Sequence, residues 1–507
     1  MFTQKIFCIG SETEKTDQLV TGLAKDSDSI NHGLVSREDF IPKDYGFYHT
    51  SVVDLSPGNI AKIAKSFDRV IMLDQPKEDY PHFKSIVTTI RLMMYLEDEG
   101  YTVEYRNNQL SQHLIGWKNF LKENKSFCFY PFLALIDNVG SYTTICPKSS
   151  APIKNSSEII NWITDPDYSA IRQKMIKGET MPDRCSNCYA SEGMGFESAR
   201  QFETLEWVGL MSLDTVDDFL AVENPVFFEI RPSNKCNVMC RMCAPNWSHL
   251  IDKEYKKINL VDKSKKWTFT NTNYDNINFT SAKRIYFGGG EPTIMPEFYD
   301  FLRRCIDNQN TNFELLIGTN GMKFSNTLLD LLDNFDNVCL AFSYDGYKEI
   351  NNYIRWLTDF DTMIENSRKL RDRGHRISLQ TVFSIWNVTT IHKIFEFYDK
   401  EYPGSTLLVQ PSGELDSLFG PYNHPYPELV VESMKRCQDT KIYYENGRSI
   451  KSMVDAVLRY YSNPDYKVNL ELLKKFYEFN DTLDESRKVK LQDYIPDLAN
   501  ARKMYGI

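Results

Sequence analysis

The chain has 507 residues, of which 42% are hydrophobic and 25% charged, and its formal net charge is −10. This length exceeds one ordinary core, so roughly two to four domains are expected, and the composition is that of a globular protein. The acidic balance disfavours nucleic acid as a partner. No apolar run approaches the ~18–20 residues that cross a bilayer. The first residues lack the pattern of a signal peptide, so a cytoplasmic location without a membrane partner is expected.

The first part of the chain alternates short apolar runs with amphipathic ones, which predicts a small α/β domain over residues 1–115. The role of this domain is left open. Its expected strands are Lys5–Ile9, Arg69–Leu73 and Thr102–Tyr105, and its expected helices are Asp17–Ala24 and Val87–Glu97.

The segment Gly10–Thr16 follows the first strand and opens a helix. It resembles the hydroxyl-rich phosphate loop of flavodoxins, in which a helix start holds an anion. Here Glu14 replaces the usual glycine, and its charge would repel a phosphate. FMN is therefore not expected, and hydroxyl groups that cap a helix explain the segment.

The chain contains 11 cysteines, and they are clustered. In a reducing compartment such clusters indicate metal ligation rather than disulfides. The first set lies in a segment, 116–222, that we expect to be a cysteine-rich module, irregular over residues 116–200. It consists of Cys128, Cys146, Cys185 and Cys188. Four thiols complete a coordination sphere, so this set suits a saturated iron–sulfur cluster or a structural zinc ion.

From about residue 223 to 412, apolar strands alternate with amphipathic helices, which predicts a parallel sheet with outer helices, as in a barrel. The expected strands are Val226–Ile230, Arg284–Phe287, Phe313–Ile317, Val338–Phe342, Ile377–Phe383 and Thr406–Val409. The expected helices are Pro296–Asp307, Asn326–Leu332, Phe360–Arg371 and Val388–Tyr398. Residues 412–427 have the composition of a linker, and 413–507 is predicted to be a helical C-terminal extension.

The second cysteine set, Cys236, Cys240 and Cys243, has the spacing C-x3-C-x2-C directly after a predicted strand. Three thiols this close can face one metal centre, but a closed zinc or cubane site normally takes four ligands. A cubane held by three cysteines has one iron open to an outside ligand. His249, six residues further on, leaves a zinc knuckle as an alternative.

Three later strands of this region end in small polar residues, which should converge with the cysteine loop because the carboxyl ends of barrel strands form the site. The first ends in Gly288–Glu291, where glycines admit a close ligand and a carboxylate can accept bonds from an ammonium group. The next two end at Gly318–Gly321 and Ser343–Gly346.

The cysteine spacing, the GGE sequence at 289–291 and the later strand ends together resemble the radical S-adenosylmethionine (SAM) superfamily over roughly 225–412. The resemblance implies a partial (β/α)6 barrel of the TIM type. It also implies a [4Fe–4S] cluster on Cys236, Cys240 and Cys243, with SAM chelating the fourth iron. One-electron cleavage of SAM then yields a 5′-deoxyadenosyl radical that abstracts hydrogen from a substrate.

The same resemblance suggests which side chains hold SAM. Gly289, Gly290 and Glu291 would hold its ammonium group, and Ser343 and Asp345 its ribose or methionine moiety. Asn320 would belong to the same pocket, and Met242 would lie near adenine. Arg355 matches an arginine that pairs with the SAM carboxylate, although Trp356 follows where many relatives have glycine; a surface salt bridge is the alternative.

The first cysteine set, with its pattern C-x11-G-x5-C followed by C-x2-C, resembles the twitch or SPASM modules that carry auxiliary [4Fe–4S] clusters. Here the spacing between glycine and cysteine is one residue longer than usual, and the module precedes the barrel rather than following it. An auxiliary [4Fe–4S] cluster is therefore expected ahead of zinc.

We expect an enzyme that modifies or crosslinks a peptide or protein, because such modules often accompany that chemistry. A radical enzyme acting on a sugar, a nucleoside or another small metabolite is the second hypothesis. A metal-stabilised SAM-binding protein without turnover is the third. A flavodoxin or ferredoxin would supply the electron.

Overall fold

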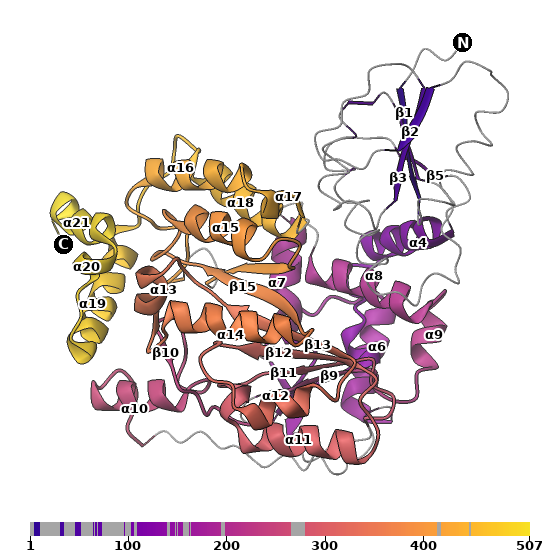
Figure 1. Ribbon diagram of the computed structural model, residues 1–507, viewed down its shortest axis with the longest axis horizontal. Coiled ribbons are helices and arrows are strands. Elements are labelled where there is room, and N and C mark those ends of the chain that lie inside the picture. The colour runs from indigo at the N-terminus through magenta and orange to yellow at the C-terminus, as the bar shows by residue number, and fades with distance from the viewer. Residues whose placement is uncertain are drawn as a thin grey trace. The chain divides into compact units, whose positions relative to one another are not determined.

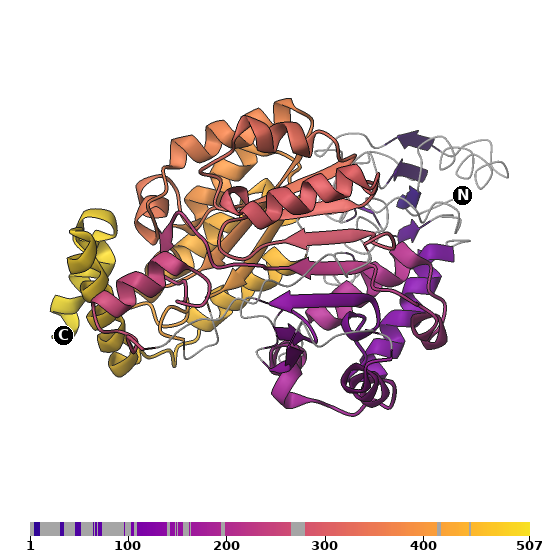
Figure 2. The same ribbon diagram turned by 90° about the horizontal axis from the view of Figure 1, so that it is seen from below.

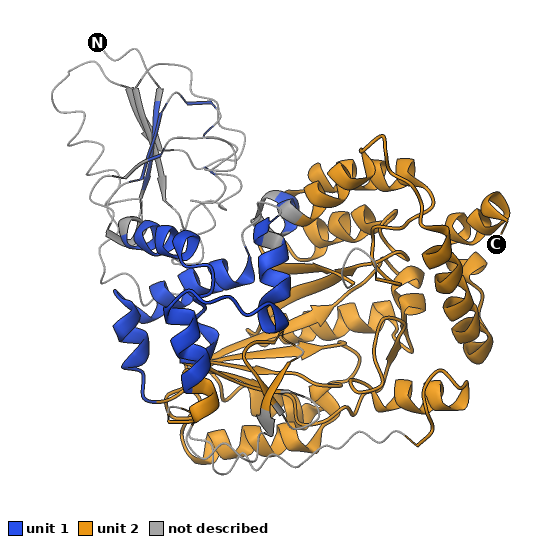
Figure 3. Ribbon diagram, turned by 180° about the vertical axis from the view of Figure 1, so that it is seen from behind, with its two compact units in different colours: residues 1–132, 169–223, 443–451 blue, residues 133–168, 224–442, 452–507 orange. Residues whose placement is uncertain are grey.

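The computed structural model (Figure 1) describes residues 5–10, 31–34, 46–51, 64, 66–67, 69–72, 96, 103–105, 109–138, 142–147, 149, 151–155, 162, 164–193, 198–264, 279–412, 417–445 and 448–506. The chain divides into two interleaved compact units (Figure 3). Unit 1 comprises residues 1–132, 169–223 and 443–451, and unit 2 comprises 133–168, 224–442 and 452–507. The domain limits expected from the sequence, near 115, 222 and 412, stay predictions.

Unit 1 contains a parallel five-stranded sheet of order β2-β3-β1-β4-β5. Its strands are β1 (Lys5–Gly10), β2 (Asn31–Leu34), β3 (Gly46–Ser51), β4 (Arg69–Met72) and β5 (Val103–Tyr105). The three strands expected here are confirmed. The expected helix Asp17–Ala24, the loop after Gly10 and, except for Leu96, the expected helix Val87–Glu97 lie outside the described residues.

The expectation that residues 116–200 are irregular is wrong, because most of the residues that the structure describes in this stretch lie in helices or strands. Its helices and those beside it are α4 (Gln109–Glu123), α5 (Tyr130–Leu133), α6 (Pro166–Ile176), α7 (Pro182–Gly193), α8 (Ala199–Met211) and α9 (Val216–Leu220). Aromatic side chains from separate segments supply the core that short helices need; Trp117, for example, meets Phe127 and Phe219. The Arg200 guanidinium is buried and donates to the carbonyl oxygens of Leu121, Asn124 and Phe127.

Unit 2 is built on a mainly parallel nine-stranded sheet of order β16-β15-β13-β12-β11-β9-β6-β7-β8, seen from below in Figure 2. Its parallel strands are β6 (Ala134–Asn138), β9 (Phe227–Ile230), β11 (Arg284–Phe287), β12 (Glu314–Thr319), β13 (Asn337–Ser343), β15 (Arg376–Phe383) and β16 (Leu407–Pro411). Strands β7 (Tyr142–Thr144) and β8 (Pro152–Asn155) add an antiparallel extension. The six strands expected from 226 to 409 are confirmed, whereas the extension β6–β8 was not expected to join this sheet.

The helices of the 223–412 region are α10 (His249–Lys257), η4 (Pro292–Ile294), α11 (Pro296–Asp307), α12 (Asn326–Leu332), α13 (Glu349–Ile354), α14 (Phe360–Asp372) and α15 (Ile391–Glu401). Of these, α11, α12, α14 and α15 cover the outer face of the sheet, whereas α10 lies away from it (Figure 1). Alternate strand residues pack beneath the covering helices; Phe287 of β11 contacts Phe298 and Phe301 of α11. In β11 this gives alternating burial, as expected of a strand with one face packed against helices.

The described residues from 427 onward are mainly helical, and α16 already begins at the end of the expected linker; that they form a separate extension stays a prediction. The helices of this stretch are α16 (Pro427–Gln438), α17 (Lys441–Glu445), α18 (Arg448–Tyr461), α19 (Leu470–Arg487), α20 (Leu491–Tyr494) and α21 (Pro496–Tyr505). Among the described helices, none is long and apolar enough to cross a membrane.

A buried histidine makes the stability of this helical stretch sensitive to pH. His424 is fully buried, its Nδ1 accepts the Tyr426 N–H at 3.2 Å, and burial lowers its pKa to about 3. In the unfolded chain the imidazole takes up its proton near its ordinary pKa of about 6.5. Stability attributable to neutral His424 is therefore present above that pH and declines as the pH falls towards 3.

We expect His424 to account for a loss of about 3 kcal/mol in the free energy of unfolding between pH 7 and pH 4. Urea unfolding of the parent and of His424→Asn, which keeps an acceptor but no titrating group, measures the difference. The variant should be less stable at pH 7 and have a flatter pH profile. Parallel profiles would contradict the assignment.

Candidate functional site

The three cysteines of the C-x3-C-x2-C sequence lie in the loop that follows β9, at the carboxyl end of the sheet. Within this loop β10 (Met239–Cys240) pairs antiparallel with β14 (Arg355–Trp356), which places Cys240 directly opposite Arg355. The short ladder brings a predicted metal ligand and a predicted SAM ligand together from positions more than a hundred residues apart.

The backbone before Cys236 runs against the glycines that follow β11. The Gly290 N–H donates to Ser233 O at 3.0 Å, and the Glu291 N–H donates to Lys235 O at 2.7 Å. A Cβ on Gly290 would lie 2.1 Å from Lys235 O, and one on Gly289 (φ +111°) would lie 2.6 Å from Ser233 O. These glycines are needed for the approach of the cysteine loop; their predicted contact with the SAM ammonium stays a prediction.

Glu291 is buried, and its carboxylate joins the end of β11 to the end of β12. Oε1 accepts from the hydroxyls of Thr293 (2.8 Å) and Thr319 (2.7 Å) and from Thr293 N–H (3.3 Å), while Oε2 accepts from Asn320 N–H at 2.6 Å. Burial raises the Glu291 pKa, and these hydrogen bonds oppose the rise. Only Oε2, with one bond, keeps acceptor capacity for the ammonium that the sequence predicts.

Asn320 connects the end of β12 to the cysteine loop. Its Nδ2 donates to Asn237 Oδ1 at 2.7 Å, and its Oδ1 accepts the Met322 N–H at 3.0 Å. Asn237 directly follows Cys236, so this amide pair fixes the loop at its first cysteine. The sequence singled out Asn320 as a ligand residue but did not point to Asn237.

Asp345 and Arg355 form a buried ion pair at the end of β13. Arg355 Nη1 donates to Asp345 Oδ2 at 2.7 Å, and Asp345 Oδ1 accepts the Val382 N–H at 2.8 Å. The Arg355 side chain is 13% exposed and that of Asp345 1%, so the surface salt bridge considered from the sequence is instead internal. Among the described residues, buried Arg355 Nε has no hydrogen-bond partner, and such a group calls for an explanation.

Charge around Arg355 favours its cationic form. Burial lowers its pKa, but the Cys240 thiolate and Asp345 outweigh burial and raise it. Arg355 therefore places a fixed positive charge beside the cysteine loop.

Met242 and Ser343, the two remaining predicted SAM ligands, make fewer contacts with the cysteine loop and the strand ends. Met242 is half-buried and packs against a cluster that includes Tyr353, Trp386 and Phe476. Ser343 is half-buried at the last position of β13, in register with Gln380 of β15.

The three thiols influence one another electrostatically. Burial raises the pKa of Cys236 to about 12, and the neighbouring Cys240 thiolate adds to that rise. Burial, followed by repulsion from Cys240 and Cys236, also raises the pKa of Cys243. All three thiols are within one loop, and metal ligation must displace their protons.

The donor set suits a cubane better than a single ion. Within the described residues, no three His, Cys, Asp or Glu side chains are grouped so as to hold one metal ion. In a [4Fe–4S] cluster, however, each thiolate binds a different iron, so its ligands stand further apart than those of one ion. His249, the ligand of the zinc alternative, has Nδ1 occupied by the Cys236 N–H at 3.1 Å.

The other cysteine set is divided between the two units. Cys128, Cys185 and Cys188 belong to unit 1 and Cys146 to unit 2, and Gly140 of the pattern lies outside the described residues. Cys185 and Cys188 lie on α7; burial raises the pKa of Cys185 to about 11, and repulsion from Cys188 adds to it. Their ligation of a common metal stays a prediction.

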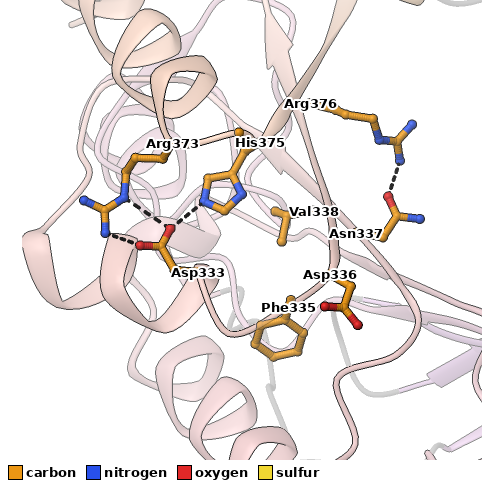
Figure 4. A pocket seen from close by; sticks show the side chains of 9 residues that line it. Asp333, Phe335, Asp336, Asn337, Val338, Arg373, His375 and Arg376 are labelled. Carbon is orange, nitrogen blue, oxygen red and sulfur yellow. Dashed lines mark hydrogen bonds and ion pairs between the residues drawn. The ribbon is translucent and has the colours of Figure 1, made fainter.

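The opposite end of the large sheet has a cavity of about 420 Å³ beside the first residues of β13 and β15 (Figure 4). There Asp333 pairs with Arg373 and with His375 Nε2, the latter at 3.1 Å. Arg376 Nη2 donates to Asn337 Oδ1 at 2.9 Å. Paired charges at the amino ends of barrel strands are typical of stability rather than catalysis, so the cavity is not the candidate site.

The comparisons with known proteins bear on the carboxyl end of this sheet. Residues 230–398 match the model of the Radical SAM superfamily. The matched segment carries the cysteine loop, the glycines and the Asp345–Arg355 pair. Members of that superfamily are enzymes. A comparison with curated proteins finds no match.

Solved structures give distant likenesses. One is anSMEcpe with bound AdoMet, at 18% identity and a TM-score of 0.31, covering 42% of this chain and 60% of that one. Another is Streptococcus suis SuiB bound to S-adenosylmethionine, at 14% identity and a TM-score of 0.29, covering 53% of this chain and 59% of that one. A third is TYW1 with a lysine-pyruvate adduct, at 15% identity and a TM-score of 0.26, covering 42% and 73%. The chain thus spans about six tenths of the first two.

Gly290→Ala should separate the cysteine loop from β11, because its methyl group would collide with Lys235 O. We expect a loss of roughly 1–3 kcal/mol in the free energy of unfolding and less iron after anaerobic reconstitution. Gly116→Ala is the control, since a Cβ there meets nothing within 4 Å. Equal stability and iron content in the two variants would contradict the close approach.

Proposed function

We propose that this protein reductively cleaves SAM and uses the resulting 5′-deoxyadenosyl radical to modify a peptide or protein. The observation that carries the proposal is the convergence of the cysteine loop, the Glu291 carboxylate and the Asp345–Arg355 pair at one end of the segment that matches the Radical SAM superfamily.

Cys236, Cys240 and Cys243 would hold a [4Fe–4S] cluster, leaving the fourth iron to SAM. When bound, this cluster supplies the electron that breaks the SAM sulfonium bond. The chain itself binds and orients: Asn320 fixes the loop at Asn237, and Arg355 keeps positive charge beside Cys240.

Two groups at this site are suited to the charged ends of the methionine moiety. Arg355 Nη1 is engaged by Asp345, whereas buried Nε has no described partner and can donate to a carboxylate. Oε2 of Glu291 can accept a bond from an ammonium group. Gly289 and Gly290 leave room for ligand along the same turn, while Ser343, Asp345 and Met242 complete the proposed SAM pocket.

Cys128, Cys146, Cys185 and Cys188 would hold an auxiliary [4Fe–4S] cluster in a twitch- or SPASM-like module, with zinc as the alternative. Support comes from the i, i+3 spacing of Cys185 and Cys188 on α7, and from the Tyr189 hydroxyl, which lies near both Ser126 and Cys185. The Tyr189 side chain of α7 therefore lies close to the segment that precedes Cys128. A flavodoxin or ferredoxin is the proposed electron donor.

The peptide substrate is inferred from the resemblance of this cysteine set to modules that accompany peptide modification. SuiB, one of the distant structural likenesses, has been solved bound to its precursor peptide SuiA. A small metabolite and binding without turnover are the competing functions.

The enzymatic proposal is tested by anaerobic reconstitution with iron and sulfide, followed by SAM and dithionite. We expect 5′-deoxyadenosine from the parent and none from Cys240→Ala, with Cys305→Ala as the control because Cys305 lies on α11, outside both sets. Reduced parent protein that binds SAM without cleaving it would support binding alone.

The two-cluster proposal predicts how iron is divided. Cys185→Ala with Cys188→Ala should remove about half of the reconstituted iron and lower thermal stability, since a structural metal contributes folding free energy. Replacement of the three loop cysteines should remove the other half and abolish SAM cleavage. Iron analysis that finds parent content in the Cys185/Cys188 variant would refute the auxiliary cluster.

A further inference from the structure

The second half of helix α19 lies against the cysteine loop, through Asn480, Leu483 and Asp484. We propose that α19 contributes to the SAM-cleaving centre. Its Asp484 forms a buried ion pair with Arg241, and this pair positions the cluster-binding loop. The inference rests on the proposed function, because it concerns how the chain holds the same three thiols.

Arg241 follows Cys240 directly and points away from solvent, with none of its surface exposed. Its guanidinium donates to Tyr353 O at 2.8 Å, to Asn480 Oδ1 at 3.2 Å and to Asp484 Oδ1 at 2.6 Å. It also lies 3.6 Å from the centre of the Tyr353 ring. A charged residue in the middle of the cysteine loop thus donates hydrogen bonds to a helix more than 230 residues away in the sequence.

The partners of Arg241 are themselves fixed. Asp484 Oδ1 accepts the Tyr353 hydroxyl at 2.9 Å, and its Oδ2 accepts the Leu491 N–H at 2.7 Å. Asn480 is fully buried and accepts the Trp386 Nε1–H at 2.9 Å. Each polar side chain of this network is therefore oriented by a hydrogen bond to another residue. A buried network of this kind defines a single arrangement of its side chains.

A second contact lies on the other side of the loop. Leu483 of α19 and Tyr255 of α10 form a buried cluster against which Met239 and Cys243 pack. Arg487, also on α19, donates from Nε and Nη2 to Glu254 of α10 at 3.0 and 2.7 Å.

A further cation of α19 faces the interior here. Nη1 of Arg487 is buried without a described hydrogen-bond partner. The loop is therefore enclosed between α10, α13 and α19.

This arrangement favours positioning over simple stabilisation. An ion pair in the interior pays for desolvation and often adds no more stability than well-packed apolar residues would. Its advantage is a defined geometry, because a fork-shaped cation accepts few orientations. Here the Arg241 N–H also donates to Ile354 O at 2.8 Å, directly before Arg355. Fixing Arg241 thereby fixes Cys240 relative to Arg355.

The test compares Arg241→Met and Arg241→Lys with Arg284→Met in the full chain. Arg284 pairs with Glu314 at the opposite, amino end of β11 and β12, in a similarly enclosed setting. After anaerobic reconstitution and reduction, each protein is measured for iron, thermal stability, and the electron paramagnetic resonance (EPR) spectrum during titration with SAM.

Arg241→Met should bind SAM at least about tenfold more weakly and have an altered spectrum, even where its melting temperature equals that of Arg284→Met. Arg241→Lys keeps the charge and should fall between parent and Arg241→Met; it also serves if Arg241→Met does not fold. Arg241 variants with parental spectra and SAM affinity would overturn the inference. A parent that binds no cluster would instead refute the proposed function.

Discussion

The site depends on one close approach of backbone to backbone. The extension of β9, Ser233–Lys235, lies against the turn Gly289–Glu291 so closely that a single methyl group on either glycine would collide with a carbonyl oxygen. Two hydrogen bonds, Gly290 N–H to Ser233 O and Glu291 N–H to Lys235 O, continue the strand pairing beyond the sheet. The first residues of the cysteine loop are therefore hydrogen-bonded as a continuation of the sheet.

Further contacts fix the cysteine loop at the ends of the neighbouring strands. The Glu291 carboxylate binds the end of β12, Asn320 at that end binds Asn237 in the loop, and Arg355 beyond β13 pairs with the loop at Cys240. The ends of β11, β12 and β13 are therefore each tied to a neighbouring strand or to the loop. The preorganisation leaves little for a bound cofactor to rearrange, which is what efficient electrostatic catalysis requires.

Local patterns made much of this arrangement predictable. The strands from 226 to 409 are apolar runs separated by amphipathic helices, and the cysteine spacing is visible without a structure. The role of Glu291 was only partly predictable, because its bonds to Thr319 and Asn320 depend on which strand lies beside β11. Strand β6 was not assigned to this sheet, because a short apolar strand does not by itself reveal that its parallel partner is β9. The contact between Arg241 and Asp484 spans 243 residues and leaves no local signal.

We expect the loop to leave one iron to the amino and carboxylate groups of SAM. Electron–nuclear double resonance on the reduced protein with SAM labelled with ¹⁵N at its amino group tests this directly. We predict a ¹⁵N hyperfine coupling that shows the amine bound to the cluster. A SAM-saturated, reduced cluster without any such coupling would contradict it.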